Sequence, residues 1–139
     1  MTIPQAAIDV IGNRPGARIA VVGASNNPDK YGNMIVRTLV DFGFSVLPVN
    51  PSARQILGLT AYPDVNTAPD PVDLVNFVTP PSVTARVLES MDAARFQVVW
   101  FQDGASDENC LKIARAKFST VVHGACIMVA TRLHASAPR

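Results

Sequence analysis

Residues 18–32 read RIAVVGASNNPDKYG, and this stretch decides the fold. Arg18–Val22 is a short apolar run rich in β-branched residues, which predicts a buried strand that ends at Gly23. Tyr31–Phe42 follows, with apolar residues at Ile35 and at the positions four and seven residues later, as on one face of a helix. A strand, a glycine turn and a helix in this order are typical of the first unit of a parallel α/β sheet.

The alternation of strands and helices continues outward from this unit. Further strands are expected at Ser45–Val49, Leu74–Val78, Gln97–Phe101 and Thr120–Val122, and further helices at Ser82–Ala94, at Asp107–Phe118 and around Ile8–Ile11. Pro48 lacks an amide donor and is expected to make its strand irregular near the end. The strands are apolar throughout, so both faces of the sheet should be covered. We predict an α/β fold, a three-layer Rossmann-like sandwich with a mostly parallel sheet of about five strands flanked by helices, in one domain over residues 1–139.

The composition disfavours several classes of protein. Twelve basic and eleven acidic residues leave a net charge of +1, whereas a nucleic-acid binder needs a strongly basic face. No stretch approaches the roughly 20 apolar residues of a membrane span, and the N-terminus lacks the pattern of a secretory signal. Two cysteines and two histidines on separate elements predict neither a disulfide framework nor a metal site. We expect a cytoplasmic protein without nucleic-acid or membrane partners.

The loops that follow the predicted strands lie at the edge where doubly wound sheets bind ligands. The first begins Gly23-Ala24-Ser25, whose small residues let an anion approach the main chain, and it reaches Lys30 at the start of a helix. Helix N-terminal amides, the Ser25 hydroxyl and the Lys30 ammonium together favour a phosphate.

The second loop bears on which nucleotide is bound. NAD-binding domains carry GxGxxG and an acidic residue at the end of the second strand, but here the loops read GASNNP and Val49-Asn50-Pro51, so NAD is disfavoured. Arg54 lies just beyond and could meet the 2′-phosphate of NADP or the 3′-phosphate of coenzyme A (CoA), or be an ordinary exposed arginine.

Five segments occur in a specific order and spacing: VVGASNNPDKYGNMIVRTL, GFSVLPVNP, PVDLVNFVTPPSV, VVWFQDGA and VVHGACIM. In these segments the chain resembles, from Arg18 to Met128, the small stand-alone CoA-binding proteins of bacteria and archaea, whose fold is similar to the CoA-binding domain of the succinyl-CoA synthetase α subunit. The resemblance implies CoA or an acyl-CoA as the cofactor, held across the first three loops. By position it implies Gly23, Ala24 and Ser25 at the pyrophosphate, Lys30 at a phosphate, Val49, Asn50 and Pro51 beside the adenosine, and Val78, Thr79, Pro80 and Pro81 near the adenine and the start of the pantetheine arm.

Three classes of function stay open. The first is a binding module that holds CoA or an acyl-CoA without catalytic residues of its own, with a homodimer as one candidate assembly. The second is a small NADP- or acyl-CoA-dependent enzyme that uses His123 or Cys126, for which the sequence places no oriented acid–base pair. The third is a redox-responsive nucleotide sensor, which would need a DNA-binding module longer than Met1–Gly16.

The segment around Cys126 departs from the family pattern. The family often has a Glu-His pair after this cysteine, whereas here Ile127-Met128 follows, and the resemblance does not imply ligase activity. Cys126 is expected to be a small buried residue, with a mixed disulfide to the CoA thiol as the alternative. Gln102 and Asp103 are expected to be a polar strand end that could touch ligand.

Overall fold

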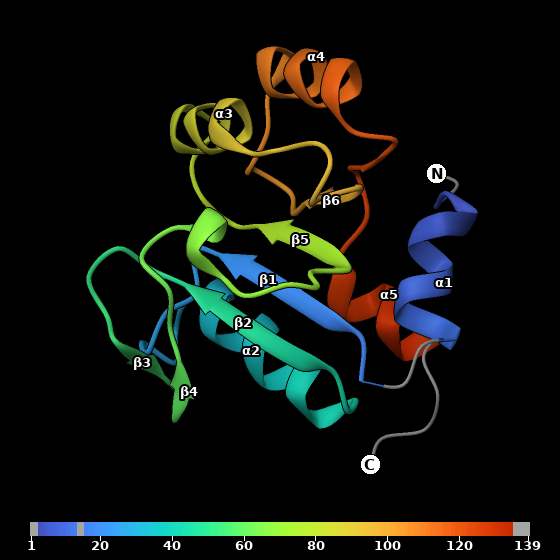
Figure 1. Cartoon of the computed structure of the whole chain (residues 1–139). Coiled ribbons are helices and arrows are strands. Elements are labelled where there is room, and N and C mark those ends of the chain that lie inside the picture. The colour runs from blue at the N-terminus through green and yellow to red at the C-terminus, as the bar shows by residue number, and fades with distance from the viewer. Residues whose placement is uncertain (1–2, 14–15, 135–139) are drawn as a thin grey trace.

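A computed structural model describes residues 3–13 and 16–134 of the chain and centres on one parallel sheet (Figure 1). Its strands are β1 (Arg18–Val22), β2 (Ser45–Val49), β5 (Leu74–Phe77), β6 (Val98–Phe101) and β7 (Thr120–Val122). They lie in the order β2-β1-β5-β6-β7, and every neighbouring pair is parallel. Counted along the chain within this sheet, the order is 2-1-3-4-5, which is one of the two common doubly wound arrangements.

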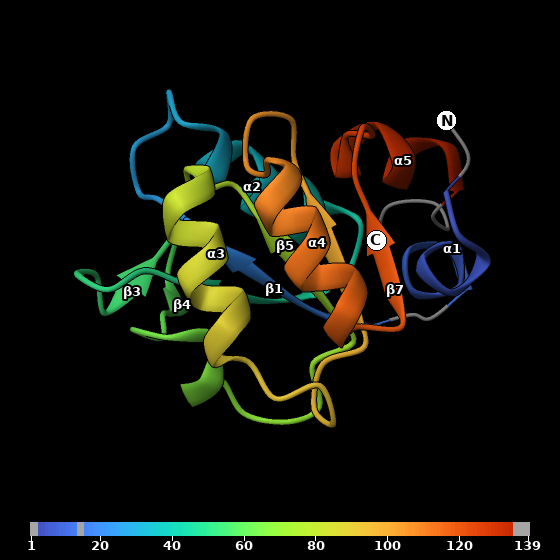
Figure 2. The same cartoon turned by 90° about the horizontal axis from the view of Figure 1, so that it is seen from above.

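Helices cover both faces of the sheet. α1 (Gln5–Asn13), α2 (Tyr31–Asp41) and α5 (Ile127–His134) lie on one side, and α3 (Pro81–Ser90) and α4 (Glu108–Lys117) lie on the other (Figures 1 and 2). Alternate residues of the central strands enter the two cores: Ile19 and Trp100 pack on the α1, α2 and α5 side, and Phe77 and Phe101 on the α3 and α4 side. The three-layer Rossmann-like α/β fold is therefore confirmed.

A short hairpin, a 3-10 turn and a C-terminal helix lie outside the predicted alternation. β3 (Gln55–Ile56) and β4 (Leu59–Thr60) form an antiparallel hairpin, and a short 3-10 turn, η1, spans Val65–Thr67. Leu57 and Gly58 both have positive φ, 52° and 78°, as the tight hairpin turn requires. α5 was also not predicted, although its buried Ile127, Ala130 and Thr131 have helical spacing.

Two sequence-based predictions about element ends are wrong. β2 stays regular through Pro48, because β2 is an edge strand and Pro48 turns its carbonyl outward to accept from the amide of Tyr62 at 2.9 Å. The helix predicted to reach Ala94 ends at Ser90, because Met91 is extended and the Asp92 carboxylate accepts from the amide of Ala94 at 2.9 Å, which forms a turn.

The expected single domain over residues 1–139 remains a prediction, since residues 1–2, 14–15 and 135–139 lie outside the described part of the chain. Over the ranges 3–13 and 16–134, no helix combines the length and hydropathy needed to cross a bilayer.

α4 begins with a titratable cap, which gives a pH-dependent prediction. The Asp107 carboxylate accepts from the amide of Cys110 at 2.9 Å, and this hydrogen bond lowers the pKa of Asp107. A carboxyl group whose folded-state pKa is lowered stabilises the fold above its unfolded pKa of about 3.9 and loses that contribution as the pH falls through the folded value. Asp107→Asn keeps an acceptor that does not titrate, so its free energy of unfolding should fall less steeply than that of the parent between pH of about 5 and about 2. Urea unfolding at stepped pH measures both slopes, and parallel curves would contradict the prediction.

Candidate ligand site at the carboxyl ends of the strands

The strand order places the switch point of the sheet between β1 and β5. From β1 the chain runs to β2 on one side, and it then crosses to β5 on the other side of β1. The loops that leave β1 and β5 therefore diverge at the carboxyl edge, where doubly wound sheets hold ligands.

Two glycines bring the loop after β1 against its neighbours. Gly23 has a φ of 99°, and a Cβ built on it would lie 2.7 Å from Cγ2 of Val78. A Cβ on Gly32, in the first turn of α2, would overlap the carbonyl oxygen of Gly23. Both contacts exclude a side chain, so the first turn of α2 is pressed directly onto the turn that ends β1.

The rest of this loop is held by its own polar side chains. The amide of Asn27 donates to Ser25 Oγ at 3.0 Å, and Nδ2 of the buried Asn33 donates to the Ser25 carbonyl at 3.0 Å. Lys30 is exposed and stands immediately before α2, where its side chain makes no capping hydrogen bond to the helix. The start of α2 therefore lacks a side-chain cap from Lys30.

Asn50 joins the loop after β2 to the loop after β1. Its Nδ2 donates to the Ala24 carbonyl at 2.9 Å, and its Oδ1 accepts from the amides of Ser52 and Ala53 at 2.8 and 3.1 Å. Asn50 therefore fixes both loops through contacts within the protein.

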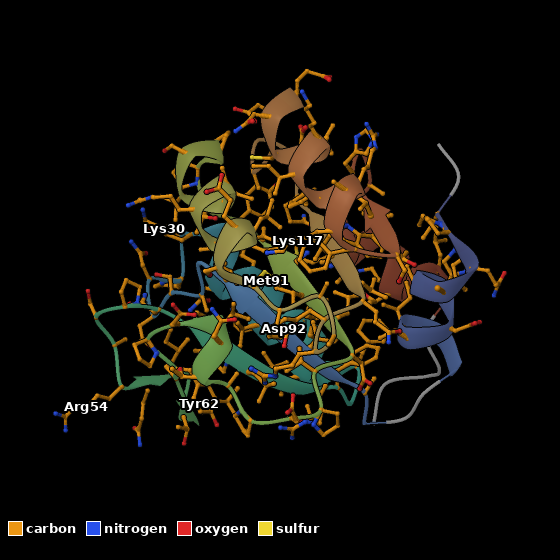
Figure 3. All side chains as sticks on the ribbon, turned by 45° about the horizontal axis from the view of Figure 1, so that its top comes forward. Lys30, Arg54, Tyr62, Met91, Asp92 and Lys117 are labelled. Atoms are coloured by element: carbon orange, nitrogen blue, oxygen red, sulfur yellow. The ribbon has the colours of Figure 1, made fainter. Side chains whose placement is uncertain are left out.

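The loop after β5 forms the opposite wall. Thr79 Oγ1 lies 2.8 Å from Oγ1 of the buried Thr84, and Pro80 and Pro81 begin α3. The structure brings together in these three loops all the residues named from the sequence: Gly23, Ala24, Ser25 and Lys30; Val49, Asn50 and Pro51; and Val78, Thr79, Pro80 and Pro81. Figure 3 shows Lys30 and Arg54 on the same side of the molecule, with Arg54 extending from its margin.

A pocket of about 430 Å³ continues this edge toward β6 and β7. Its lining residues come from four segments of the chain and are Tyr31, Val78, Gln102, Asp103, Gly124, Ala125 and Cys126. Of the eleven residues that the resemblance implied at the ligand, Val78 also lines the pocket, and so do Gln102, Asp103 and Cys126, which the sequence analysis named separately. Tyr31, Gly124 and Ala125 were missed, although their positions after Lys30 and after β7 put them at the same edge.

The expected burial of Cys126 is wrong, because this residue is only half-buried and lines the pocket. It directly precedes α5, the helix that was not predicted. Trp100 Nε1 donates to the Ala125 carbonyl at 2.8 Å and fixes the segment beside the sulfur. By contrast, Cys110, Trp100 and Phe101 are fully buried in the core.

His123 has a basic neighbour. Its Nε2 lies 3.2 Å from Nη2 of Arg115, which is a cation and cannot serve as the carboxylate partner of a catalytic histidine. Among the described side chains, no group of three or more His, Cys, Asp or Glu residues could hold a metal ion.

The sequence model of a family described as "CoA binding domain" matches residues 17–132. This chain belongs to the CoA-binding domain family. Coenzyme A is thus the cofactor that the family supports, and the predicted recognition and cofactor are confirmed.

Relatives of two sizes share the domain. The uncharacterized protein YneT of Bacillus subtilis is 33% identical over 113 residues, which are 81% of this chain and 84% of YneT. A conserved hypothetical protein from Pyrococcus furiosus has a solved structure with 43% identity and a TM-score of 0.78, covering 81% of this chain and 97% of that one. The ADP-forming acetate–CoA ligase I of Archaeoglobus fulgidus is 41% identical over 71 residues, which are 51% of this chain but 10% of the ligase.

The close contact between Gly32 and the carbonyl of Gly23 gives a prediction about stability. Gly32→Ala should lower the free energy of unfolding by about 1–3 kcal/mol, because the added methyl group meets backbone rather than a movable side chain. Arg86→Ala, at an exposed position of α3, is the control and should change it by less than about 0.5 kcal/mol. Urea unfolding measures both variants. A Gly32→Ala variant as stable as the control would show that α2 moves away at little cost.

Proposed function

We propose that this chain binds CoA or an acyl-CoA across the loops that follow β1, β2 and β5, without catalysis of its own. The diphosphate lies at the first turn of α2, the adenosine between the loops after β2 and β5, and the pantetheine arm runs toward the pocket. The observation that carries the proposal is the glycine contact at the start of α2: with neither Gly23 nor Gly32 bearing a side chain, main-chain groups form the surface that a diphosphate would meet.

Three groups favour an anion at this turn. α2 begins at Tyr31 with no side-chain cap from Lys30, which suits an anion at the positive end of the helix. Ser25 Oγ accepts from the amide of Asn27, which leaves the hydroxyl proton to donate to a phosphate oxygen. The exposed ammonium of Lys30 supplies a positive charge.

The adenosine site relies on shape more than on polar contacts. Oδ1 of Asn50 and one of the two Nδ2 hydrogens are engaged within the protein, so this residue mainly builds the wall. Pro51 and Pro80 are exposed and Val78 is half-buried, so rigid apolar surfaces face the edge from both sides of the switch point.

The same loops disfavour a dinucleotide. β2 ends in Val49 and is followed by Asn50 and Pro51, so the strand end lacks the carboxylate that would bind the ribose hydroxyls of NAD. Arg54 is exposed just beyond and suits a phosphate on the ribose. NADP and CoA both carry such a phosphate, so their affinities must be compared directly.

Lys30→Ala tests the placement of the diphosphate. Losing one charge–phosphate contact should raise the Kd for CoA about five- to tenfold, or roughly 1–1.4 kcal/mol. Titration calorimetry on ligand-free protein, with CoA, NAD and NADP in parallel, measures this effect. Lys112→Ala on α4, in the opposite helical layer, is the control and should leave the Kd unchanged. An unchanged Kd in Lys30→Ala would remove Lys30 from the site, and selective binding of NADP would overturn the assignment of CoA.

Arg54→Ala tests recognition of the ribose phosphate. The parent protein should prefer CoA over 3′-dephospho-CoA by about fivefold or more, as expected for one exposed charge-assisted contact, and Arg54→Ala should lose this preference. The same calorimetry gives all four Kd values. If the variant keeps the full preference, Arg54 is an ordinary surface residue.

A further inference from the structure

The wall of the pocket that lies toward β7 carries a free thiol. Cys126 is half-buried immediately before α5 and lines a pocket of about 430 Å³, which is within the size range of small-molecule sites. An accessible thiol in a concave site can react with whatever the site concentrates there.

The sulfur is held by a side chain that is itself fixed. Gln102, which is 7% exposed, donates from Nε2 to Cys126 Sγ at 3.4 Å. Its Oε1 accepts from the amide of Ile127 at 2.8 Å and from Nδ2 of Asn76 at 3.4 Å. These bonds tie the thiol to both the sheet and the first turn of α5.

An unpartnered acceptor lies beside two residues of the pocket wall, Val78 and Gln102. Asn76 is fully buried, and its Oδ1 has no hydrogen-bond partner among the described residues. Asn76 is two residues before Val78, so both side chains lie on the same face of the sheet, and Val78 lines the pocket. A buried acceptor without a partner is unfavourable, and a donor from a bound water or ligand can offset that cost. A ligand that brings an N–H group to this side of the pocket would satisfy the acceptor.

Val78 connects the pocket to the phosphate turn. Its Cγ2 comes within 2.7 Å of where a Cβ on Gly23 would stand, and Val78 is also part of the pocket wall. A ligand with its diphosphate at Gly23 can therefore pass over Val78 and bring its far end to Cys126. The pantetheine arm of CoA has this form, with amide N–H groups along it and a thiol at its end.

We propose that Cys126 is a redox-active cysteine that forms a mixed disulfide with the thiol end of bound CoA; this rests on the proposed function. The oxidant is the symmetric disulfide of CoA. The Cys126 thiolate attacks one sulfur of that disulfide, a new bond joins the two sulfurs, and the original S–S bond breaks. The second CoA leaves as a thiolate and takes up the proton that Cys126 released. Cys126 is oxidised, one CoA is reduced, and an excess of free thiol reverses the exchange.

Cys110 provides the internal comparison. It is fully buried on α4, its thiol donates to the Pro81 carbonyl at 3.2 Å, and burial raises its pKa. It has neither the access nor the thiolate character that exchange requires.

The test uses intact-mass spectrometry of the reduced, ligand-free protein after addition of CoA disulfide. One adduct is expected in the parent and in Cys110→Ser, and none in Cys126→Ser. The parent should react at least about tenfold faster with CoA disulfide than with hydroxyethyl disulfide, because binding raises the effective concentration of the reacting sulfur. Excess desulfo-CoA, which lacks the thiol, should slow the reaction with CoA disulfide and leave the reaction with hydroxyethyl disulfide unchanged.

Calorimetry with desulfo-CoA separates the two proposals. If desulfo-CoA binds but no adduct forms on Cys126, the redox role is overturned and the binding function stands. Equal rates with the two disulfides, or an adduct on Cys110, also overturn the redox role. If desulfo-CoA does not bind and no adduct forms, both proposals fail.

Discussion

The contact between two backbone turns determines the rest of this edge of the molecule. Gly32 in the first turn of α2 lies against the carbonyl of Gly23, where β1 ends, and neither position has room for a Cβ. This contact sets where α2 begins and therefore where its uncapped N-terminus faces. It also brings Gly23 against the Cγ2 methyl group of Val78 in the adjacent loop, so three elements meet at one point of the carboxyl edge.

The carboxyl edge divides into two chemically different halves that share Val78. On the β1 and β2 side, the loops offer an uncapped helix start, a hydroxyl and exposed cations. On the β6 and β7 side, the pocket offers an amide and a thiol, with the amide fixed by α5 and by Asn76. A ligand that is charged at one end and carries sulfur at the other matches this order. NADP matches the first half equally well but brings no sulfur to the second, so the second half is the more selective feature.

The sequence was most informative where periodicity and loop position agree. The apolar runs of β1, β2 and β5 predicted the sheet, and the loops at their ends predicted where Gly23, Asn50 and Thr79 would meet. The hairpin of β3 and β4 was missed because its strands have two residues each, which is too few to show a period. Its attachment to the first loop is also non-local, because Asn26 donates to the Gln55 carbonyl 29 residues away. The position of Cys126 was missed for a related reason. The exposure of Cys126 depends on the position of α5. That helix packs against α1 and α2, and local sequence patterns do not encode such tertiary contacts.

The size of the relatives bears on what chemistry this chain can perform. In the A. fulgidus ligase the matching stretch is a tenth of the protein, so most of that ligase has no counterpart in the match. The solved P. furiosus protein is covered over 97% of its length, so a protein of about this size exists on its own. Within the described residues of the present chain, the polar side chains of the pocket wall are those of Tyr31, Gln102, Asp103 and Cys126, and Gln102 contacts the thiol. Exchange between two sulfurs needs only a thiolate, a disulfide and an approach path. The simplest reaction open to such a site is therefore at sulfur, and it is reversible.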